Sequence, residues 1–385
     1  MGRRQFLQNE LLFDVAEMRP EVRQMKSNSL MSLSAAPVSC ERTQFTDKEQ
    51  EEIDEFCRRI RKEVTKSGLT LLHRAVKDWS VGVVKYLVFN GANVNVKNKY
   101  GTAPLHLAND VGIAEFLVSN GANVNEKNVH GITPLHFAGN SKIAKYLISK
   151  GADVNVREDD KGCTPLHIAT RRGDVDFVKC LVSAGANVDA KTKSGRTPLH
   201  FVFSLWNNDD RSIDIINFLV SAGANVDSQD YKGSTPLHLA AEWEKLNVAQ
   251  FLISIGADVH VKDKQGMTPL HSVAKYRCES IEIIKYLVAN GADVNTKNDR
   301  GNTPLHDAAN RIDGNVEFMR FLVSLGADVY VKDENDRTPL DIAKENNRKC
   351  MAVVECLENL EWGLGFGEGE GCDRETEWDK NTDDF

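Results

Sequence analysis

The chain has 385 residues, 41% of them hydrophobic, and a formal net charge of −8 at pH 7. This apolar content is enough for a buried core, so the composition excludes a chain that is disordered throughout. No apolar run approaches the roughly 20 residues of a membrane span. The net charge of residues 67–360 is −1, which is too small to attract a nucleic-acid backbone over a long range.

The first 66 residues predict a linker followed by a cap. Residues 27–40 are rich in serine and other small residues, and we expect residues 1–45 to be largely flexible. Residues 46–66 predict a helix, because Ile53, Phe56, Ile60 and Val64 fall on one face. Since stacked repeats need a covered end, we expect this helix to cap the unit that follows.

A repeated motif dominates residues 67–360. Thr-Pro-Leu-His or a close variant occurs nine times, with copies 30 to 38 residues apart, and a Gly-Ala-Asn/Asp-Val signature precedes eight of them by 15 or 16 residues. The motifs of units one to nine end at His73, His106, His136, His167, His200, His238, His271, His306 and Asp341. This periodicity predicts nine similar structural units rather than separate globular domains.

The fourth unit shows how each repeat is expected to fold. Thr164 suits the cap of a first helix and Pro165 its first turn. Val175, Val178, Leu181 and Val182 then form the apolar stripe of a second helix, which Gly185 ends in a left-handed conformation. The Asn- and Lys-rich residues 186–195 predict a hairpin tip. One such unit cannot bury its apolar face alone, so neighbours must stack.

The two motifs at this period resemble the ankyrin repeat. The resemblance implies an all-α solenoid over residues 67–360, with a helix-turn-helix and a hairpin tip in each repeat. It also implies that the eight motif histidines hydrogen-bond backbone groups that link adjacent units. At one helix-packing distance apart, about 10 Å, these imidazoles are too distant to share one metal ion. We therefore predict no catalytic residue, no cofactor, no metal site and no enzymatic activity.

The repeats differ in length. Units two and three have 15 residues between the motif histidine and the next Gly-Ala, where units one, four and six have 18. One turn of the first helix should be missing there, and Ala103 in place of the capping threonine should weaken unit two. Unit five is five residues longer than unit four, and we expect the addition between its two helices, around residues 206–211.

The candidate protein-binding residues lie just after the motif histidines. The resemblance places this end of the first helix on the concave side of the solenoid, where members of the family contact partners. Aromatic and arginine side chains gathered there are typical of interface hot spots. The candidates are Arg171, Arg172, Leu205, Trp206, Glu242, Trp243, Lys275, Tyr276 and Arg311. An alternative for Trp206 and Trp243 is that they pack against the long loop of unit five.

A basic residue recurs at the hairpin tips, as at Lys191, Lys262 and Lys297, with Gln229 as the exception. This ladder could dock an acidic ligand. However, neighbouring tips are separated by about a Debye length and carry acidic residues next to the lysines, so we expect a solvated surface.

The end of the chain differs in composition from the repeats. Residues 361–385 carry nine acidic and two basic side chains with alternating glycines, which predicts a disordered acidic tail. Eight cysteines are scattered without a Cys-x-x-Cys pair, which indicates reduced thiols inside a cell.

These features predict a non-enzymatic scaffold, a cytoplasmic monomer, that binds a protein partner through the concave face of units four to eight. Nucleic acid and membrane are not expected partners. The alternative is a regulatory adaptor, or a secreted effector acting in a host cell's cytosol, whose terminal segments recruit a second protein.

Overall fold

The computed structural model describes residues 46, 48, 51–55, 69–78, 80–204, 209–275, 281–311, 316–345 and 351–361. The chain divides into residues 1–48 and 49–385, and the fold described below belongs to the second part. The expected flexible segment 1–45, most of the expected cap helix and the expected tail after residue 361 lie outside the described residues.

The described residues are helical and contain no strand, as the all-α prediction requires. Each unit contributes a first helix that starts at the motif proline, or at Leu71 in the same position of unit one, and a longer second helix. The first helices are α3 (Leu71–Asp78), η2 (Pro104–Leu107), α6 (Pro134–Phe137), α8 (Pro165–Arg172), η3 (Pro198–Ser204), α11 (Pro236–Glu242), α13 (Pro269–Lys275), α15 (Pro304–Ala309) and α17 (Pro339–Glu345). The second helices are α4 (Val81–Phe89), α5 (Val111–Ser119), α7 (Ser141–Ser149), α9 (Val175–Ser183), α10 (Asp209–Ser221), α12 (Leu246–Ser254), α14 (Ile281–Ala289), α16 (Val316–Ser324) and α18 (Met351–Glu361).

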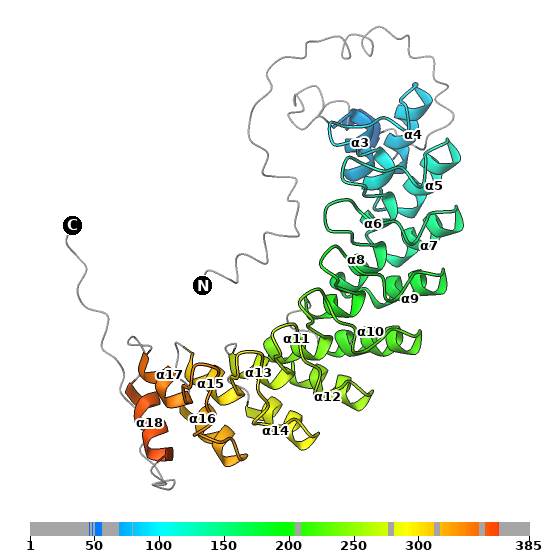
Figure 1. The fold of residues 1–385 in the computed structure, drawn as a ribbon. Coiled ribbons are helices and arrows are strands. Elements are labelled where there is room, and N and C mark those ends of the chain that lie inside the picture. Colours follow the sequence, from blue (N-terminus) through cyan, green and yellow to red (C-terminus); the bar gives the residue numbers. More distant parts are fainter. Residues whose placement is uncertain are drawn as a thin grey trace, which may run out of the picture. The chain divides into compact units, whose positions relative to one another are not determined.

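The helix pairs follow one another in a single row in chain order (Figure 1). First helices contact the first helices of the next unit, as α11 contacts α13, and second helices contact second helices, as α12 contacts α14. Because every unit packs on its neighbours, the core is a continuous apolar spine, as expected of a solenoid.

The buried stripe of the second helix is shifted around the helix from the one that the sequence predicts. In α9 Val178 and Leu181 are buried as expected, but Val175 and Val182 are only half-buried. Phe177, which the predicted stripe omits, is 1% exposed. The reason is that α9 packs against its own first helix and also against α7 and α10 on either side, so contacts with neighbouring units help decide which of its residues are buried.

The turn after the second helix follows the prediction. Gly185 has φ +86°, the left-handed conformation that glycine adopts without steric cost. Its N–H donates to the Val182 carbonyl at 3.0 Å, and the N–H of Ala186 donates to the Leu181 carbonyl at 3.0 Å. These two bonds satisfy carbonyls at the helix end and direct the chain into the hairpin tip.

Hairpin tips of successive units are joined by backbone hydrogen bonds. The Tyr231 N–H donates to the Ser194 carbonyl at 2.9 Å, and the Lys264 N–H donates to the Lys232 carbonyl at 2.9 Å. Glycine allows this close approach: a Cβ on Gly195 would lie 2.6 Å from the Tyr231 nitrogen. The tips therefore form a second row of contacts beside the apolar spine.

The tip lysines were expected to be solvated, but several are bound to the next tip. The Lys262 ammonium donates to the Lys297 carbonyl at 2.9 Å, and the Lys297 ammonium donates to the Lys332 carbonyl at 2.8 Å. Gln229, the exception in the ladder, makes the same link to the Lys262 carbonyl at 3.0 Å. These side chains are exposed yet bridge neighbouring units, because their length matches the spacing of the tips.

Units two and three have the shortened first helices that their spacing predicts. Both η2 and α6 are four residues long, half the length of α8. Side-chain hydrogen bonds link these two units to their neighbours. The Arg172 guanidinium donates to the Ala138 carbonyl at 2.7 Å, and the Asn109 amide donates to the Lys77 carbonyl at 3.3 Å.

The extra residues of unit five are partly helical. The insertion was expected between the two helices, but residues 209–211 belong to α10, which is 13 residues long against nine in α9. The Lys245 ammonium lies 2.9 Å from the Asp209 carboxylate and ties this added turn to unit six. Residues 205–208 lie outside the described residues.

The start of the repeats is covered by residues 51–55, which are helical. Ile53 is 1% exposed, and the Ser80 hydroxyl donates to the Glu52 carboxylate. These contacts support a capping role for the helix, which stays a prediction for residues 46–66 as a whole.

Candidate protein-binding surface

The motif histidines link neighbouring units. In each, Nε2 lies 2.8 to 3.2 Å from a backbone carbonyl of the next unit, 26 to 34 residues ahead. The accepting carbonyls belong to Thr102, Ile132, Cys163, Arg196, Ser234, Met267, Asn302 and Arg337. This confirms the structural role that the family resemblance implies for these eight residues.

The other ring nitrogen is also occupied. In His167, Nδ1 accepts from the Thr164 N–H at 3.1 Å and lies 2.9 Å from the Thr164 hydroxyl. Because Nε2 faces a carbonyl and must carry the proton, Nδ1 is the acceptor and the ring is neutral. No lone pair remains for a metal ion or a transferred proton, so these histidines serve the spine and not a reaction.

Burial keeps the imidazoles neutral. Desolvation lowers the pKa of His136, His167 and His271 from 6.5 to about 4, with only partial opposition from the carbonyl bonds. A charged ring would lose its solvation and break the Nδ1 contact.

The ninth motif ends the series of links. Asp341 replaces histidine, and its carboxylate accepts from the Thr338 N–H and hydroxyl, both at 2.9 Å. These bonds, the N–H first, lower the pKa of Asp341. A carboxylate keeps the cap but has no proton to donate to a tenth unit.

Within the described ranges no group of three or more His, Cys, Asp or Glu side chains is placed to hold a metal ion. In the same part of the chain, no helix combines the length and apolar character that crossing a bilayer requires. The thiol of Cys163 is buried, and desolvation raises its pKa to about 12, so it is unreactive.

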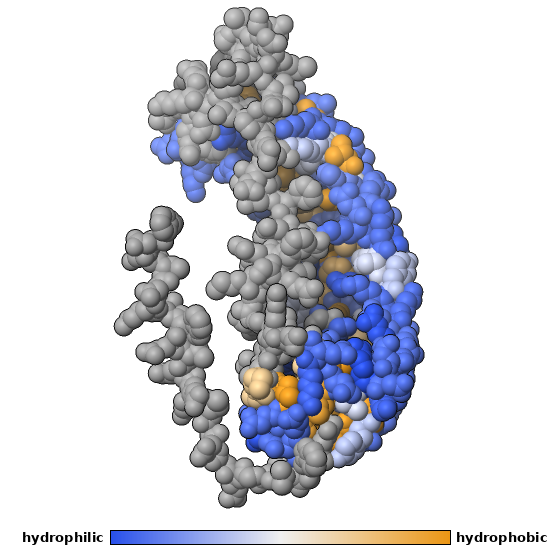
Figure 2. All heavy atoms as spheres, turned by 60° about the vertical axis from the view of Figure 1, so that its left-hand side comes forward, coloured by the Kyte–Doolittle hydropathy of each residue, from blue (hydrophilic) through white to orange (hydrophobic). Residues whose placement is uncertain are grey.

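The surface that varies between units is formed by the ends of the first helices, the turns after them and the adjacent tips. We call it the first-helix face. Most of the coloured surface in Figure 2 is hydrophilic, with hydrophobic residues in separate small patches. The exposed large apolar side chains include Val129 and Tyr231 at two tips and Phe137 at the end of α6. Phe137 packs edge-on against His106, with ring centroids 6.0 Å apart.

Two predicted arginines sit at the end of α8. Arg172 is exposed, and its guanidinium donates to the Ala138 carbonyl. Arg171 is half-buried, burial lowers its pKa, and its Nη1 is buried without a hydrogen-bond partner. Arg171 therefore retains an unused donor, whereas Arg172 is partly committed to the fold.

The predicted residues of units six to eight lie in different environments. Glu242 and Trp243 are half-buried at the end of α11. Lys275 is exposed, with its ammonium 3.4 Å from the Met267 sulfur. Arg311 is only 7% exposed, and its guanidinium lies over the Phe318 ring, 5.5 Å from the centroid. Arg311 thus contributes more to packing than the sequence suggests.

Three predicted residues, Leu205, Trp206 and Tyr276, lie outside the described residues. The choice between partner contact and local packing for Trp206 stays open, as does the predicted aromatic cluster. Among the described candidates, α11 and α13 are in contact and bring Trp243 and Lys275 onto neighbouring helix ends.

Sequence reasoning missed Asp307. It follows the motif histidine of unit eight, where most other units carry an apolar residue such as Ile168 or Leu239. Asp307 is 8% exposed, and its Oδ2 is buried without a hydrogen-bond partner. Desolvation raises its pKa to about 7 despite the opposing charges of Lys275 and Arg300. An acidic residue at an apolar repeat position is the signal that could have found it.

A polar cavity of about 470 Å³ lies beside this unit, between units eight and nine. Its lining residues are Arg300, Asn302, Asn310, Glu334, Asn335, Arg337, Ile342 and Glu345. Like Asp307, Asn302 has a buried oxygen, Oδ1, without a hydrogen-bond partner. Buried polar atoms are paired in most native structures, so two such acceptors near one cavity are unusual.

Comparisons with known proteins agree with this architecture. The family model for ankyrin repeats, which covers three copies at a time, matches residues 50–128, 72–158, 135–230, 204–298, 237–333 and 279–358. The crystal structure of the human ASB11 ankyrin repeat domain aligns with a TM-score of 0.50 and 27% identity, covering 59% of this chain and 97% of that domain.

Curated sequences match over short stretches. The chain is 50% identical over 42 residues to ankyrin repeat protein OPG189 of monkeypox virus, which is 11% of this chain and 8% of that protein. It is 49% identical over 43 residues to human Rabankyrin-5, 11% of this chain and 4% of that protein. The chain thus spans a small part of these relatives, and the matches establish the repeat and no more.

Proposed function

The chain belongs to the ankyrin repeat family, and from this premise we propose that it is a non-enzymatic scaffold that binds a protein partner on the first-helix face of units four to eight. Ankyrin repeats are in general protein–protein interaction modules. The finer proposal concerns which surface of this chain carries the interaction.

One observation carries this proposal. The shared motif residues are used within the fold, since each motif histidine binds its own unit through one nitrogen and the next unit through the other. The positions that vary in charge and size, including Arg171, Glu242, Trp243 and Lys275, lie at the ends of the first helices. A function specific to this chain has to reside in residues that differ between repeats.

The physical advantage of such a surface is its rigidity. Backbone bonds between tips and histidine bonds between units fix the spacing of the side chains before a partner arrives. Association then loses less ordering entropy than it would on a flexible surface.

The test compares two double variants of the intact chain in affinity capture with quantitative mass spectrometry. Trp243→Ala with Lys275→Ala removes two side chains from the first-helix face. Asp176→Ala with Lys179→Ala removes two exposed side chains from the second helix α9 and serves as the matched control. Circular dichroism confirms that both variants are folded.

We expect the parent and the α9 control to capture at least one protein in equal amounts. The Trp243 and Lys275 variant should capture at least about tenfold less of it. Retention of every captured protein by that variant contradicts the proposal. A chain lacking residues 1–45 and 362–385 separates a simple binder, which keeps all its partners, from an adaptor, which loses one.

A further inference from the structure

The hairpin tips of neighbouring units form one continuous row, because backbone hydrogen bonds join each tip to the next. The Lys193 N–H of unit five donates to the Lys161 carbonyl of unit four at 2.8 Å. The bonds from Tyr231 and from Lys264 to the preceding tips, both 2.9 Å, continue the row through units six and seven. A backbone hydrogen bond holds two residues about 5 Å apart, so side chains of different units become close neighbours.

The middle of this row is basic and exposed. Its seven residues include four lysines and one tyrosine, and none of them is acidic. All seven are exposed, and none of the lysines belongs to the tip ladder. We call this segment the basic tip row; it consists of Lys161, Lys193, Ser194, Tyr231, Lys232, Lys264 and Gln265.

The acidic residues of tips six and seven, Asp230 and Asp263, are used within the turns. Asp230 Oδ1 accepts two backbone N–H groups of its own tip at 2.8 and 3.1 Å, and Asp263 Oδ1 accepts two at 2.8 and 2.9 Å. The Asp230 side chain is 3% exposed and lies 3.5 Å from the Arg196 guanidinium. Among the described residues, neither Lys232 nor Lys264 forms an ion pair with a carboxylate. The exposed charge of the row is therefore positive.

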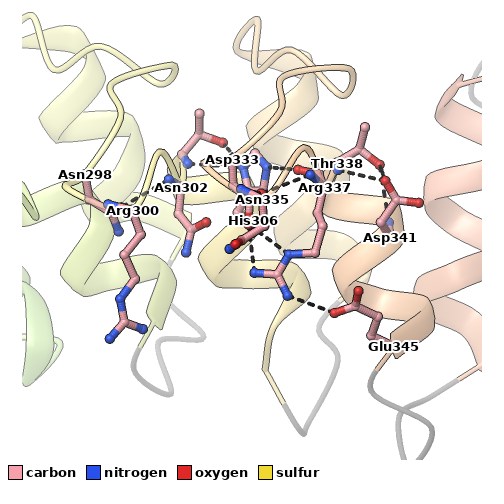
Figure 3. A network of polar contacts seen from close by, with 11 residues as sticks. Asn298, Arg300, Asn302, His306, Asp333, Asn335, Arg337, Thr338, Asp341 and Glu345 are labelled. Carbon is pink, nitrogen blue, oxygen red and sulfur yellow. Dashed lines mark hydrogen bonds and ion pairs between the residues drawn. The ribbon is translucent and has the colours of Figure 1, made fainter.

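This positive charge is local. Asp159 and Asp160 precede the row in the tip of unit four. Beyond its other end, in unit nine, the tip arginine is compensated: Figure 3 shows Arg337 bonded to both Asp333 and Glu345, at 2.7 and 2.8 Å. The basic tip row thus lies between regions of mixed charge, in a chain whose net charge is −8.

The charge of the row selects an acidic occupant. Four lysines repel a basic segment, and a long polyphosphate backbone also meets the net negative charge of the chain. A short acidic segment interacts mainly within a Debye length of about 8 Å, where the lysines dominate. The row is roughly 25 Å long, which matches about eight residues of extended peptide. Tyr231, which is 59% exposed, offers an aromatic surface in its middle.

We propose that the basic tip row binds an acidic, extended segment of the protein partner. This inference rests on the proposed protein-binding function and adds the chemistry of the partner. The tips of units four to seven belong to the first-helix face, so one partner can contact the row and the adjacent helix ends together.

The test titrates octapeptides onto the full chain. The probes are an acetylated, amidated peptide of alternating glutamate and serine, its glutamine analogue and its lysine analogue. NMR of chains with 13C-labelled tyrosine follows the ring signal of Tyr231, which a Tyr231→Phe variant assigns. We expect a saturable shift with the glutamate peptide and a response at least about tenfold weaker with the other two. Raising the salt from about 50 to about 500 mM should weaken glutamate-peptide binding at least about fivefold.

Two double variants locate the charge that binds the peptide. Lys232→Gln with Lys264→Gln removes two exposed ammonium groups from the row. Lys142→Gln with Lys145→Gln removes the same charge from exposed positions of α7 and is the matched control. We expect the first pair to weaken glutamate-peptide binding at least about fivefold and the control to leave it unchanged. Circular dichroism checks that both variants are folded.

The proposal is overturned if the glutamate peptide leaves the Tyr231 signal unchanged, if either analogue binds equally, or if the two double variants bind alike. Two further probes identify other occupants. Tighter binding of an oligothymidylate of the same length would assign the row to nucleic acid. Binding of the glutamate peptide only to a chain that lacks residues 362–385 would assign the row to the chain's own acidic end. Either result also overturns the proposal.

Failure of this inference is distinct from failure of the proposed function. If the glutamate peptide binds while the Trp243 and Lys275 variant retains every captured protein, the helix ends are not the binding face and the basic tip row stands. If the peptide does not bind while that variant loses a captured protein, the face stands and the acidic chemistry of the partner is wrong.

Discussion

The first-helix face differs between units two and three and units eight and nine. In the former, Arg172 of unit four binds the Ala138 carbonyl at the end of the shortened α6, and Asn109, which follows the shortened η2, binds the Lys77 carbonyl of unit one. In the latter, Asn302 and Asp307 keep buried oxygens without donors. Both regions are irregular, but only the second leaves hydrogen-bonding capacity unused.

This difference separates structural variation from functional variation. Where a repeat departs from the pattern and neighbouring side chains bind its polar groups, no hydrogen-bonding group is left for a ligand. Where polar atoms stay unpaired, the fold retains an energetic cost that a ligand can remove. The predictions below test each side of this comparison.

The largest expected effect is shared by both regions, because both depend on the histidine spine. His136 in unit three and His271 in unit seven, like His167, have a pKa of about 4 in the folded chain against 6.5 for the free side chain. The unfolded chain therefore binds more protons between pH 6.5 and 4, and stability falls as the pH falls through this window.

The pKa difference corresponds to ~3 kcal/mol of unfolding free energy for each of these three side chains. Urea unfolding followed by circular dichroism at pH 7, 5.5 and 4.5 measures the loss. A midpoint that does not change between pH 7 and 4.5 would contradict neutral, carbonyl-bound imidazoles.

The second effect distinguishes unit eight. Asp307 has a folded pKa of about 7, raised by desolvation above its ordinary 3.8, so its contribution to stability is lost as pH rises toward and through 7. Asp307→Ser should stabilise the chain at pH 8 by up to ~4 kcal/mol, and the gain should shrink as pH falls toward 3.8. Urea unfolding at pH 8 and pH 5 tests the sign, and destabilisation at pH 8 would show that Asp307 is paired.

The third effect distinguishes units two and three. Arg172→Met keeps an unbranched side chain similar to the stem of arginine but removes the donor at 2.7 Å from the Ala138 carbonyl. We expect a loss of ~1–2 kcal/mol in the free energy of unfolding. The substitution of the exposed Lys179 by Met is the control for urea unfolding. Equal stability of the two variants would contradict a stabilising bond between Arg172 and unit three.

The smallest effect concerns the exposed tip ladder. Lys262→Met removes the side-chain link to the Lys297 carbonyl but leaves the backbone bonds between the tips. Because the side chain is exposed and competes with water, we expect no measurable change in the unfolding midpoint. A shift as large as that of Arg172→Met would mean that the lysine ladder, and not the histidine spine, sets the coupling between units.

The sequence was sufficient for the architecture because its signals are local and repeated. Thr-Pro-Leu-His and Gly-Ala fix each cap and turn, and the missing turn of α6 follows from a count of residues. The interactions between units were harder to foresee. Whether Arg172 is a surface charge or a bridge to Ala138 depends on a carbonyl 34 residues away.

The candidate site was only partly foreseeable for the same reason. Arg311 reads as a surface arginine, but the Phe318 ring covers it. Asp307 stands in the sequence as an acidic residue at an apolar position, yet its burial depends on the packing of units seven and eight around it. Such sites become visible when the repeats are compared position by position and each exception is checked for a partner.

The most direct test of the account is the footprint of a captured partner by hydrogen exchange on the intact complex. We predict protection at the ends of α8, α11, α13 and α15 and at the adjacent tips, with unchanged exchange in the second helices α9, α12 and α14. Protection confined to those second helices would contradict the assignment of binding to the first-helix face.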